Sequence, residues 1–156
     1  MNRIYLLIGK FAEITQKIEL KLGEVCEKSE IIKEFSRHAK MTELDYNQVK
    51  DDAAFLKEKM ENMTFGQMIG IVYESKSLSN DEINNLKVLL GKRNYFTHEY
   101  FKYTNFTNAT EDLIIDEFEA IKADLTKLNQ MLKRLNLILE NQENRIQYLL
   151  SKHGLK

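Results

Sequence analysis

Proline is absent from all 156 residues of this chain, and glycine occurs only six times. Proline breaks helices and glycine weakens them, so little in the sequence interrupts a helix. No stretch shows the alternation of apolar and polar residues between Asn-Gly or Asp-Gly turns that predicts a β-hairpin. We therefore expect an all-α protein.

Length and composition predict one domain covering residues 1–156. A chain of this length can bury a core without disulfides or metals, and 43% hydrophobic with 30% charged residues is typical of soluble globular proteins. The lone Cys26 has no disulfide partner and is expected to be a small apolar filler in a reducing compartment. The apolar run at residues 4–8 is too short for a signal peptide or a membrane span, so we expect a cytoplasmic protein without membrane contact.

Apolar residues recur every three or four positions near the start of the chain, which predicts a first amphipathic helix. Ser29 is the expected cap of a short second helix that would carry Phe35. The stripe of the first helix consists of Ile4, Leu7, Ile8, Phe11, Ile14, Ile18, Leu22 and Val25.

Polar residues at a spacing of three mark further helix starts, because a Ser or Thr cap and an acidic or amide side chain three residues later satisfy each other's backbone N–H groups. A polar loop is expected in "ESKSLSN", residues 74–80, and a second loop in "YTNFTNAT", residues 103–110. Between them we expect a helix over residues 80–103. The pairs are Thr42 with Asp45, Thr64 with Gln67, and Ser79 with Glu82.

The C-terminal third has a strict heptad spacing, which predicts a helix of more than forty residues with one polar position in its seam. Such a helix would be much longer than the first one. It should therefore bend near "ENQENR", residues 140–145, or protrude onto a partner. The seam residues are Phe118, Ile121, Leu125, Leu128, Leu132, Leu135, Leu139, Gln142, Ile146 and Leu149.

Arg93 lies in an unusual position on the helix expected over residues 80–103. At about 100° per residue it falls among Leu86, Leu89 and Leu90, in the middle of the apolar stripe. A desolvated guanidinium must be paired or must face an opening, because arginine cannot lose its charge. His98 falls on the flank of the same stripe.

Two interpretations of this arginine stay open at the level of residue patterns. Arg93 could face a polar site lined by Asn94 and His98 and walled by aromatic rings. Alternatively, it could pair with a core carboxylate and His98 could be a structural histidine, since an Arg-x4-His spacing occurs by chance in many helices. Carboxylates suited to that pairing are Glu13, Glu24 and Asp45.

The stretch "RNYFTHEYF", residues 93–101, resembles the Arg-x4-6-His motif of HEPN domains and the Arg-x4-His-x-Tyr version found in HEPN toxins. This resemblance implies an up-and-down bundle of four main helices plus a short extra helix, usually a two-fold dimer whose motifs face each other. Many HEPN proteins are metal-independent endoribonucleases of toxin–antitoxin, abortive-infection or other defence systems, and others are not catalytic.

The resemblance assigns roles to four residues. Arg93 would bind the phosphate and stabilise its developing charge, and His98 would act as general acid and base. Asn94 would orient His98 or the phosphate. Tyr100 would support the cleft, and it matches the tyrosine that is adenylylated in HEPN toxins paired with a nucleotidyltransferase antitoxin. His38 and His153 match nothing in the motif and are expected on the surface.

These features give two functional hypotheses. The first is an endoribonuclease that cuts tRNA or mRNA as a homodimer, without metal or other cofactor, with an antitoxin or nucleotidyltransferase as a further partner. The second is a non-catalytic HEPN module that binds a nucleotide or a partner protein, and a purely structural bundle is a third. A net charge of −1 argues against a broad electrostatic grip on nucleic acid, so no DNA partner is expected.

Overall fold

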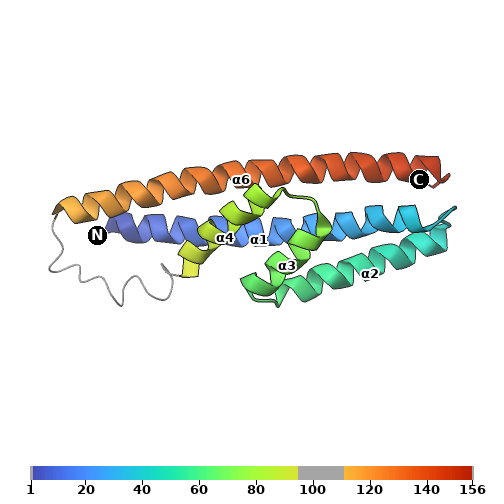
Figure 1. The fold of residues 1–156 in the computed structure, drawn as a ribbon, viewed down its shortest axis with the longest axis horizontal. Coiled ribbons are helices and arrows are strands. Elements are labelled where there is room, and N and C mark those ends of the chain that lie inside the picture. The colour runs from blue at the N-terminus through green and yellow to red at the C-terminus, as the bar shows by residue number, and fades with distance from the viewer. Residues whose placement is uncertain (1, 95–110, 156) are drawn as a thin grey trace.

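The computed structural model describes residues 2–94 and 111–155, and these residues form an all-helical bundle (Figure 1). No strand occurs in those two ranges. The predicted all-α class and the long C-terminal helix are both confirmed. The helices are α1 (Asn2–Arg37), α2 (Glu43–Glu61), α3 (Phe65–Ser75), α4 (Asn80–Asn94) and α6 (Glu111–Lys152).

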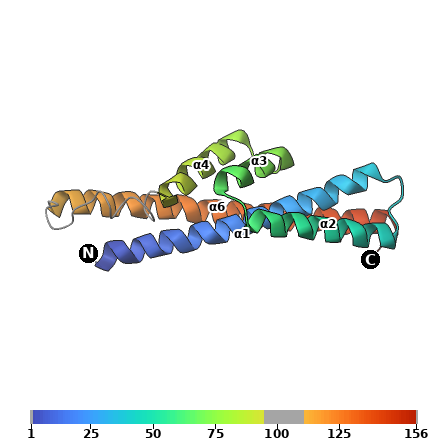
Figure 2. The same ribbon diagram turned by 90° about the horizontal axis from the view of Figure 1, so that it is seen from below.

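The two longest helices, α1 and α6, run parallel and side by side along the length of the molecule (Figures 1 and 2). With 36 and 42 residues, they span about 54 and 63 Å at ~1.5 Å per residue. The prediction of a separate helix after Ser29 is wrong, because α1 continues to Arg37. Ser29 is buried, and its hydroxyl donates to the Ser75 carbonyl at 3.2 Å instead of capping a helix. Since α1 is nearly as long as α6, the predicted bend or protrusion of the C-terminal helix is not needed, and α6 is one continuous helix.

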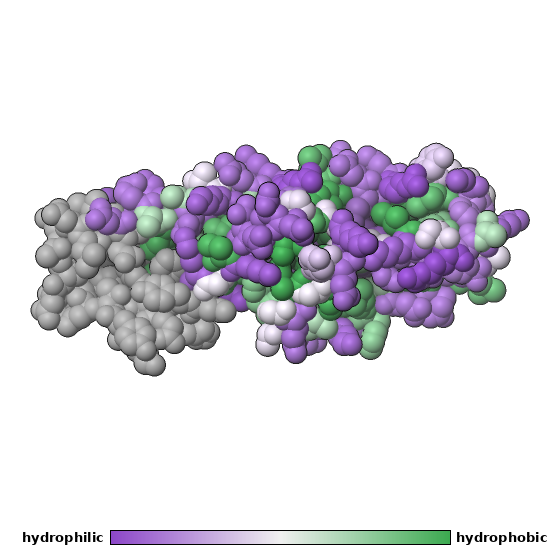
Figure 3. Space-filling model, in the orientation of Figure 1, coloured by the Kyte–Doolittle hydropathy of each residue, from purple (hydrophilic) through white to green (hydrophobic). Residues whose placement is uncertain are grey.

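The remaining described helices are arranged around this pair. α2 runs back along the C-terminal half of α1, and the short helices α3 and α4 lie across the middle of α1 (Figures 1 and 2). Successive described helices therefore alternate in direction along the chain. On the face shown in Figure 3, hydrophilic side chains predominate, with smaller apolar patches between them.

All three predicted capping boxes are present. The paired bonds measure 3.1 and 3.2 Å at the start of α2, 3.1 and 3.3 Å at α3, and 3.1 Å each at α4. They fix where these helices begin, as the sequence indicated. The predicted continuation of α4 beyond Asn94 and the predicted loop over residues 103–110 lie outside the described residues.

The core consists of two apolar clusters separated by a polar layer. One cluster joins the first part of α1 to α3, α4 and the first part of α6, and the other joins the ends of α1 and α6 to α2. Between them lie Ser29 of α1, Ser75 of α3 and Gln142 of α6, which we call the waist. Gln142 is the polar residue of the heptad seam, and its Nε2 donates to the Val25 carbonyl at 3.1 Å.

His153 is not a plain surface residue, contrary to the prediction. Its Nδ1 accepts a hydrogen bond from the Met41 N–H at 3.0 Å, and its ring packs on Phe35 with centroids 5.2 Å apart. It therefore ties the end of α6 to the turn between α1 and α2. His38 is half-buried, with Nδ1 2.9 Å from the Glu34 carbonyl oxygen. Within the two described ranges, no helix is both long and apolar enough to cross a membrane.

Replacing Gln142 by methionine is expected to leave the free energy of unfolding unchanged or to raise it by about 1 kcal/mol. The reason is that Gln142 Oε1 is buried without a hydrogen-bond partner among the described residues, so the change removes an unsatisfied acceptor together with one bond to Val25. Urea unfolding measures this, with Gln147→Met at an exposed position of α6 as the control. A loss above about 1 kcal/mol would show that the amide stabilises the waist.

Candidate functional site at the end of α4

Arg93 lies in the last turn of α4, on the helix face that the sequence predicted. The residues around it on that face, Leu86, Leu89 and Leu90, are buried to 96% or more. The Arg93 side chain keeps 20% of its surface exposed. The guanidinium thus lies at the edge of the apolar core instead of inside it.

The guanidinium forms an ion pair with Glu19 of α1 (Arg93 Nη1 to Glu19 Oε1), and the Glu19 side chain is 24% exposed. A carboxylate partner was one of the two interpretations, but none of the three suggested residues provides it. Glu13 pairs with Lys17 and Glu24 with Lys21 on the surface of α1, while Asp45 caps α2. Glu19 pairs with Arg93 because α4 crosses α1 at that level.

The neighbouring Lys92 forms a second ion pair on the opposite side of α4. Its Nζ lies 3.0 Å from both carboxylate oxygens of Asp124, which belongs to α6 and is buried. A buried carboxylate needs such a partner because water no longer solvates it. The two pairs hold the end of α4 between α1 and α6 and make the four charges sum to zero.

Each ion pair lies beside a pocket. Glu19 lines a pocket of about 280 Å³ between α1, α2 and α3, where Leu20 and Met60 add apolar surface. Lys92 and Asp124 line a second pocket of about 440 Å³ between α4 and α6. The Arg93–Glu19 pair is therefore close to open space.

The other predicted site residues are not placed. His98 and Tyr100 lie outside the described residues, and so does the side chain of Asn94. Of the four residues that the resemblance singles out, only Arg93 has a described side chain.

Cys26 is buried in the core, as expected for an apolar filler. Burial raises the pKa of its thiol to about 11, although a hydrogen bond with Ser75 and the charge of Lys33 act in the opposite direction. Such a thiol is protonated at neutral pH and is a poor nucleophile. Where the structure describes the chain, no group of three or more His, Cys, Asp or Glu side chains could hold a metal ion.

Comparisons of this sequence with protein-family models, with curated proteins and with solved structures give no match. The HEPN resemblance therefore rests on the motif residues and their helical setting.

Sequence reasoning did not identify Glu19 and Asp124. A weak signal existed for Glu19: on a helical wheel it lies about 100° from Ile18, nearer to the buried stripe of α1 than Glu13 or Glu24. Asp124 directly precedes the seam residue Leu125. Both positions show that a carboxylate flanks a core face, but neither shows which helix crosses there.

Glu19→Gln is expected to lower the free energy of unfolding by about 1–2 kcal/mol, because it removes the negative charge that pairs with the mostly buried Arg93 guanidinium. Urea unfolding at pH 7 provides the measurement. The matched control is Glu13→Gln on the same helix, whose pair with Lys17 is 62% and 56% exposed, so a loss below about 0.5 kcal/mol is expected there. Equal losses in the two variants would show that the Arg93–Glu19 pair stabilises the fold no more than the exposed Lys17–Glu13 pair.

Stability is expected to fall in acid partly through Glu82, which lines the pocket between α4 and α6. Burial raises the pKa of this carboxyl, but hydrogen bonds from Arg134 and Ser79 and the charge of Arg134 outweigh burial and bring it below the usual 4.5. The folded state thus favours the ionised form, so this contribution is complete above pH 4.5 and is lost as the pH falls through the lower folded pKa.

Urea unfolding between pH 7 and pH 3 tests this contribution. Glu82→Gln should show a smaller loss of stability over that range than the original protein. Glu140→Gln, at an exposed position of α6, serves as control and should leave the profile unchanged. If the original protein and Glu82→Gln lose the same free energy of unfolding between pH 7 and pH 3, Glu82 does not contribute to the acid sensitivity.

Proposed function

We propose that this chain is a metal-independent endoribonuclease of the toxin–antitoxin or phage-defence type. The observation that carries the proposal is Arg93, an arginine in the apolar stripe of α4 that stays one-fifth exposed and precedes His98 by five residues. An arginine at the edge of a core can meet an anion, whereas one sealed inside cannot.

The chemistry follows from the side chains of the motif. The 2′-hydroxyl of the RNA attacks the adjacent phosphorus, and the bond from phosphorus to the 5′-oxygen breaks. His98 takes the proton of the hydroxyl or gives one to the leaving oxygen, since imidazole titrates near neutral pH. Arg93 donates to the phosphate oxygens as negative charge grows on them. The products are a 2′,3′-cyclic phosphate and a 5′-hydroxyl, and the nucleophile needs no metal.

Glu19 has two effects on this mechanism. Its ion pair fixes one side of the Arg93 guanidinium, which lowers the entropy that is lost when a phosphate binds. Its charge also opposes the approach of RNA, as does the Asp124 carboxylate beside Lys92. Such a site would need further RNA contacts elsewhere on the protein.

The proposal includes an assembly. Two copies would form a homodimer with the two motifs facing each other in a shared cleft, and tRNA or mRNA would bind there. The protein would act in the cytoplasm, and an antitoxin or a nucleotidyltransferase would control it. Tyr100 would be the residue modified by adenylylation.

The test is incubation of purified protein with labelled tRNA and mRNA in the presence of EDTA. We expect cleavage that leaves 2′,3′-cyclic phosphate ends, and a rate at least about 100-fold lower in His98→Ala, the usual scale of general acid–base catalysis. His38→Ala, which alters a histidine outside the motif, should keep the full rate. Circular dichroism and urea unfolding confirm that the variants fold.

Arg93→Ala should abolish cleavage, and Arg93→Lys should retain only a small part of it, because lysine lacks the planar fork of donors. Relief of toxicity on expression by Arg93→Ala would agree with this result. Wild type and His98→Ala that leave both RNAs equally intact would contradict the ribonuclease.

One observation favours the second candidate, a non-catalytic HEPN-type module that binds a nucleotide or a partner protein. Both described cations at the end of α4, Lys92 and Arg93, are already paired with carboxylates. A site neutralised in this way suits a modest anchor better than a catalyst that must hold an RNA chain. Nucleotide binding without cleavage, weakened by Arg93→Ala, would support this alternative.

A further inference from the structure

A third pocket, remote from the motif in sequence, lies at the waist. It is an open surface pocket with a volume of about 480 Å³, within the range of small-ligand pockets, and residues of α1, the turn between α3 and α4, and α6 line it. Lys33 reaches it from α1, Ser77 from the turn, and Arg134 and Arg145 from α6.

The charge of this pocket distinguishes it from the two pockets beside the ion pairs. Three cationic side chains, Lys33, Arg134 and Arg145, line it, and none of its described lining residues is acidic. The pocket between α4 and α6 contains the carboxylates of Glu82 and Asp124. In a chain with 24 acidic and 23 basic residues, a pocket whose charged lining residues are all cations shows an uneven distribution of charge.

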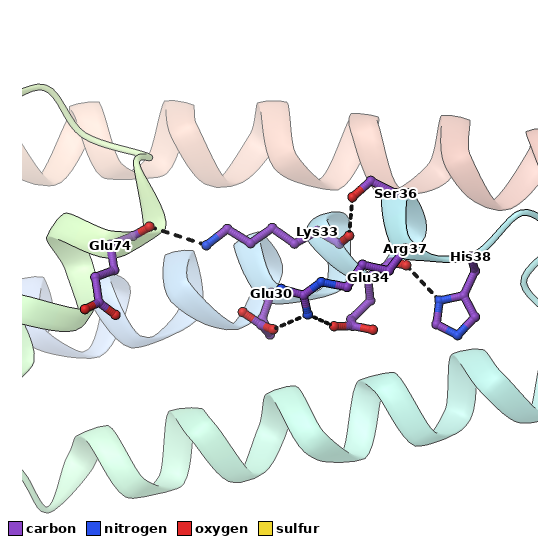
Figure 4. A network of polar contacts seen from close by, with 7 residues as sticks. All are labelled: Glu30, Lys33, Glu34, Ser36, Arg37, His38 and Glu74. Carbon is purple, nitrogen blue, oxygen red and sulfur yellow. Dashed lines mark hydrogen bonds and ion pairs between the residues drawn. The ribbon is translucent and has the colours of Figure 1, made fainter.

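The three cations retain donors for a ligand. Lys33 crosses from α1 to the end of α3, where its Nζ makes a long bond of 3.4 Å to the Glu74 carbonyl and no other bond to a described residue (Figure 4). Arg134 uses its Nε toward Glu82 at 2.9 Å, and its two terminal nitrogens have no partner among the described residues. The Arg145 guanidinium lies 5.2 Å from the Tyr148 ring centroid and forms no ion pair within the described ranges.

The nearby carboxylates on α1 form ion pairs with cations outside the pocket. Glu30 and Glu34 both pair with Arg37, within about one helical turn of Lys33 on α1 (Figure 4). On α6, Glu143 pairs with Lys28. Among the described residues, the ion pair found for a pocket cation is that of Arg134 with Glu82.

The remaining lining suits the organic part of a ligand. Ile32 and Ile138 give the pocket an apolar side, and the Asn141 amide adds a donor and an acceptor that no described residue uses. The hydroxyls of Ser29 and Ser77 donate to the Ser75 carbonyl at 3.2 and 3.5 Å, which fixes the turn against α1. A pocket that combines cations with apolar side chains matches a phosphate attached to an organic body.

We propose that the waist pocket binds a phosphate group carried by a nucleotide or by an RNA backbone, with Lys33, Arg134 and Arg145 as its ligands. This site is independent of the Arg93 motif. It would exist whether or not the chain is a ribonuclease, and under the ribonuclease proposal it would supply the additional RNA contact.

Isothermal titration calorimetry of the full chain at low ionic strength tests the site, with adenosine monophosphate as the first probe. We expect saturable binding at millimolar or lower concentration, weakened at least about tenfold in the double variant Lys33→Gln/Arg145→Gln. The matched control is Lys133→Gln, an exposed α6 cation outside this pocket, which should change the affinity less than twofold. Urea unfolding checks that each variant keeps its stability.

Two further titrations identify the source of the phosphate. Inorganic phosphate that binds as tightly as adenosine monophosphate would assign the affinity to the phosphate alone. A short oligoribonucleotide that binds more tightly than either, with the same dependence on Lys33 and Arg145, would assign the site to an RNA backbone. His98→Ala should bind adenosine monophosphate and inorganic phosphate like wild type, so loss of cleavage and loss of this site are separable.

Two results would overturn the proposal. One is the absence of saturable binding of every probe. The other is an equal loss of affinity in the double variant and in Lys133→Gln, which would show that only the overall charge of the protein matters.

Discussion

The parallel packing of α1 on α6 is the interaction on which the rest of the structure depends. Each helix supplies a continuous apolar stripe, and the two stripes form most of the buried core. Because the helices are nearly equal in length, they bury each other over most of their course. α2 then packs along one end of α1, and α3 and α4 lie across its middle, so every other described element is positioned against α1.

The end of α4 shows how this arrangement controls the candidate site. The end of α4 lies across α1 and α6, and each of those helices presents a carboxylate to one of its cations. This arrangement holds Arg93 in a defined position and also cancels its charge. The Arg93–Glu19 ion pair therefore fits both a catalytic and a structural role for Arg93. A reaction that depends on His98 would distinguish the two roles.

The waist is the second place where helix packing brings polar and charged side chains together. The seam between α1 and α6 becomes polar at Gln142, and the turn between α3 and α4 covers that level through the bond from Ser29 to Ser75. Cations from α1 and α6 collect at the edge of this turn. Two apolar clusters meeting at a polar layer thus leave room for a basic pocket.

The sequence by itself determined the helical class, the starts of α2, α3 and α4, and the buried faces of α4 and α6, because capping boxes and apolar periodicity act over a few residues. It also showed that Arg93 must be paired or must face an opening. Only the tertiary structure decided that Glu19 is that partner, that α1 continues through Ser29, and that Lys33 meets Arg134 and Arg145 at one pocket. Those outcomes depend on which helices cross and at what level, and contacts between residues more than forty positions apart leave no periodic trace in the chain.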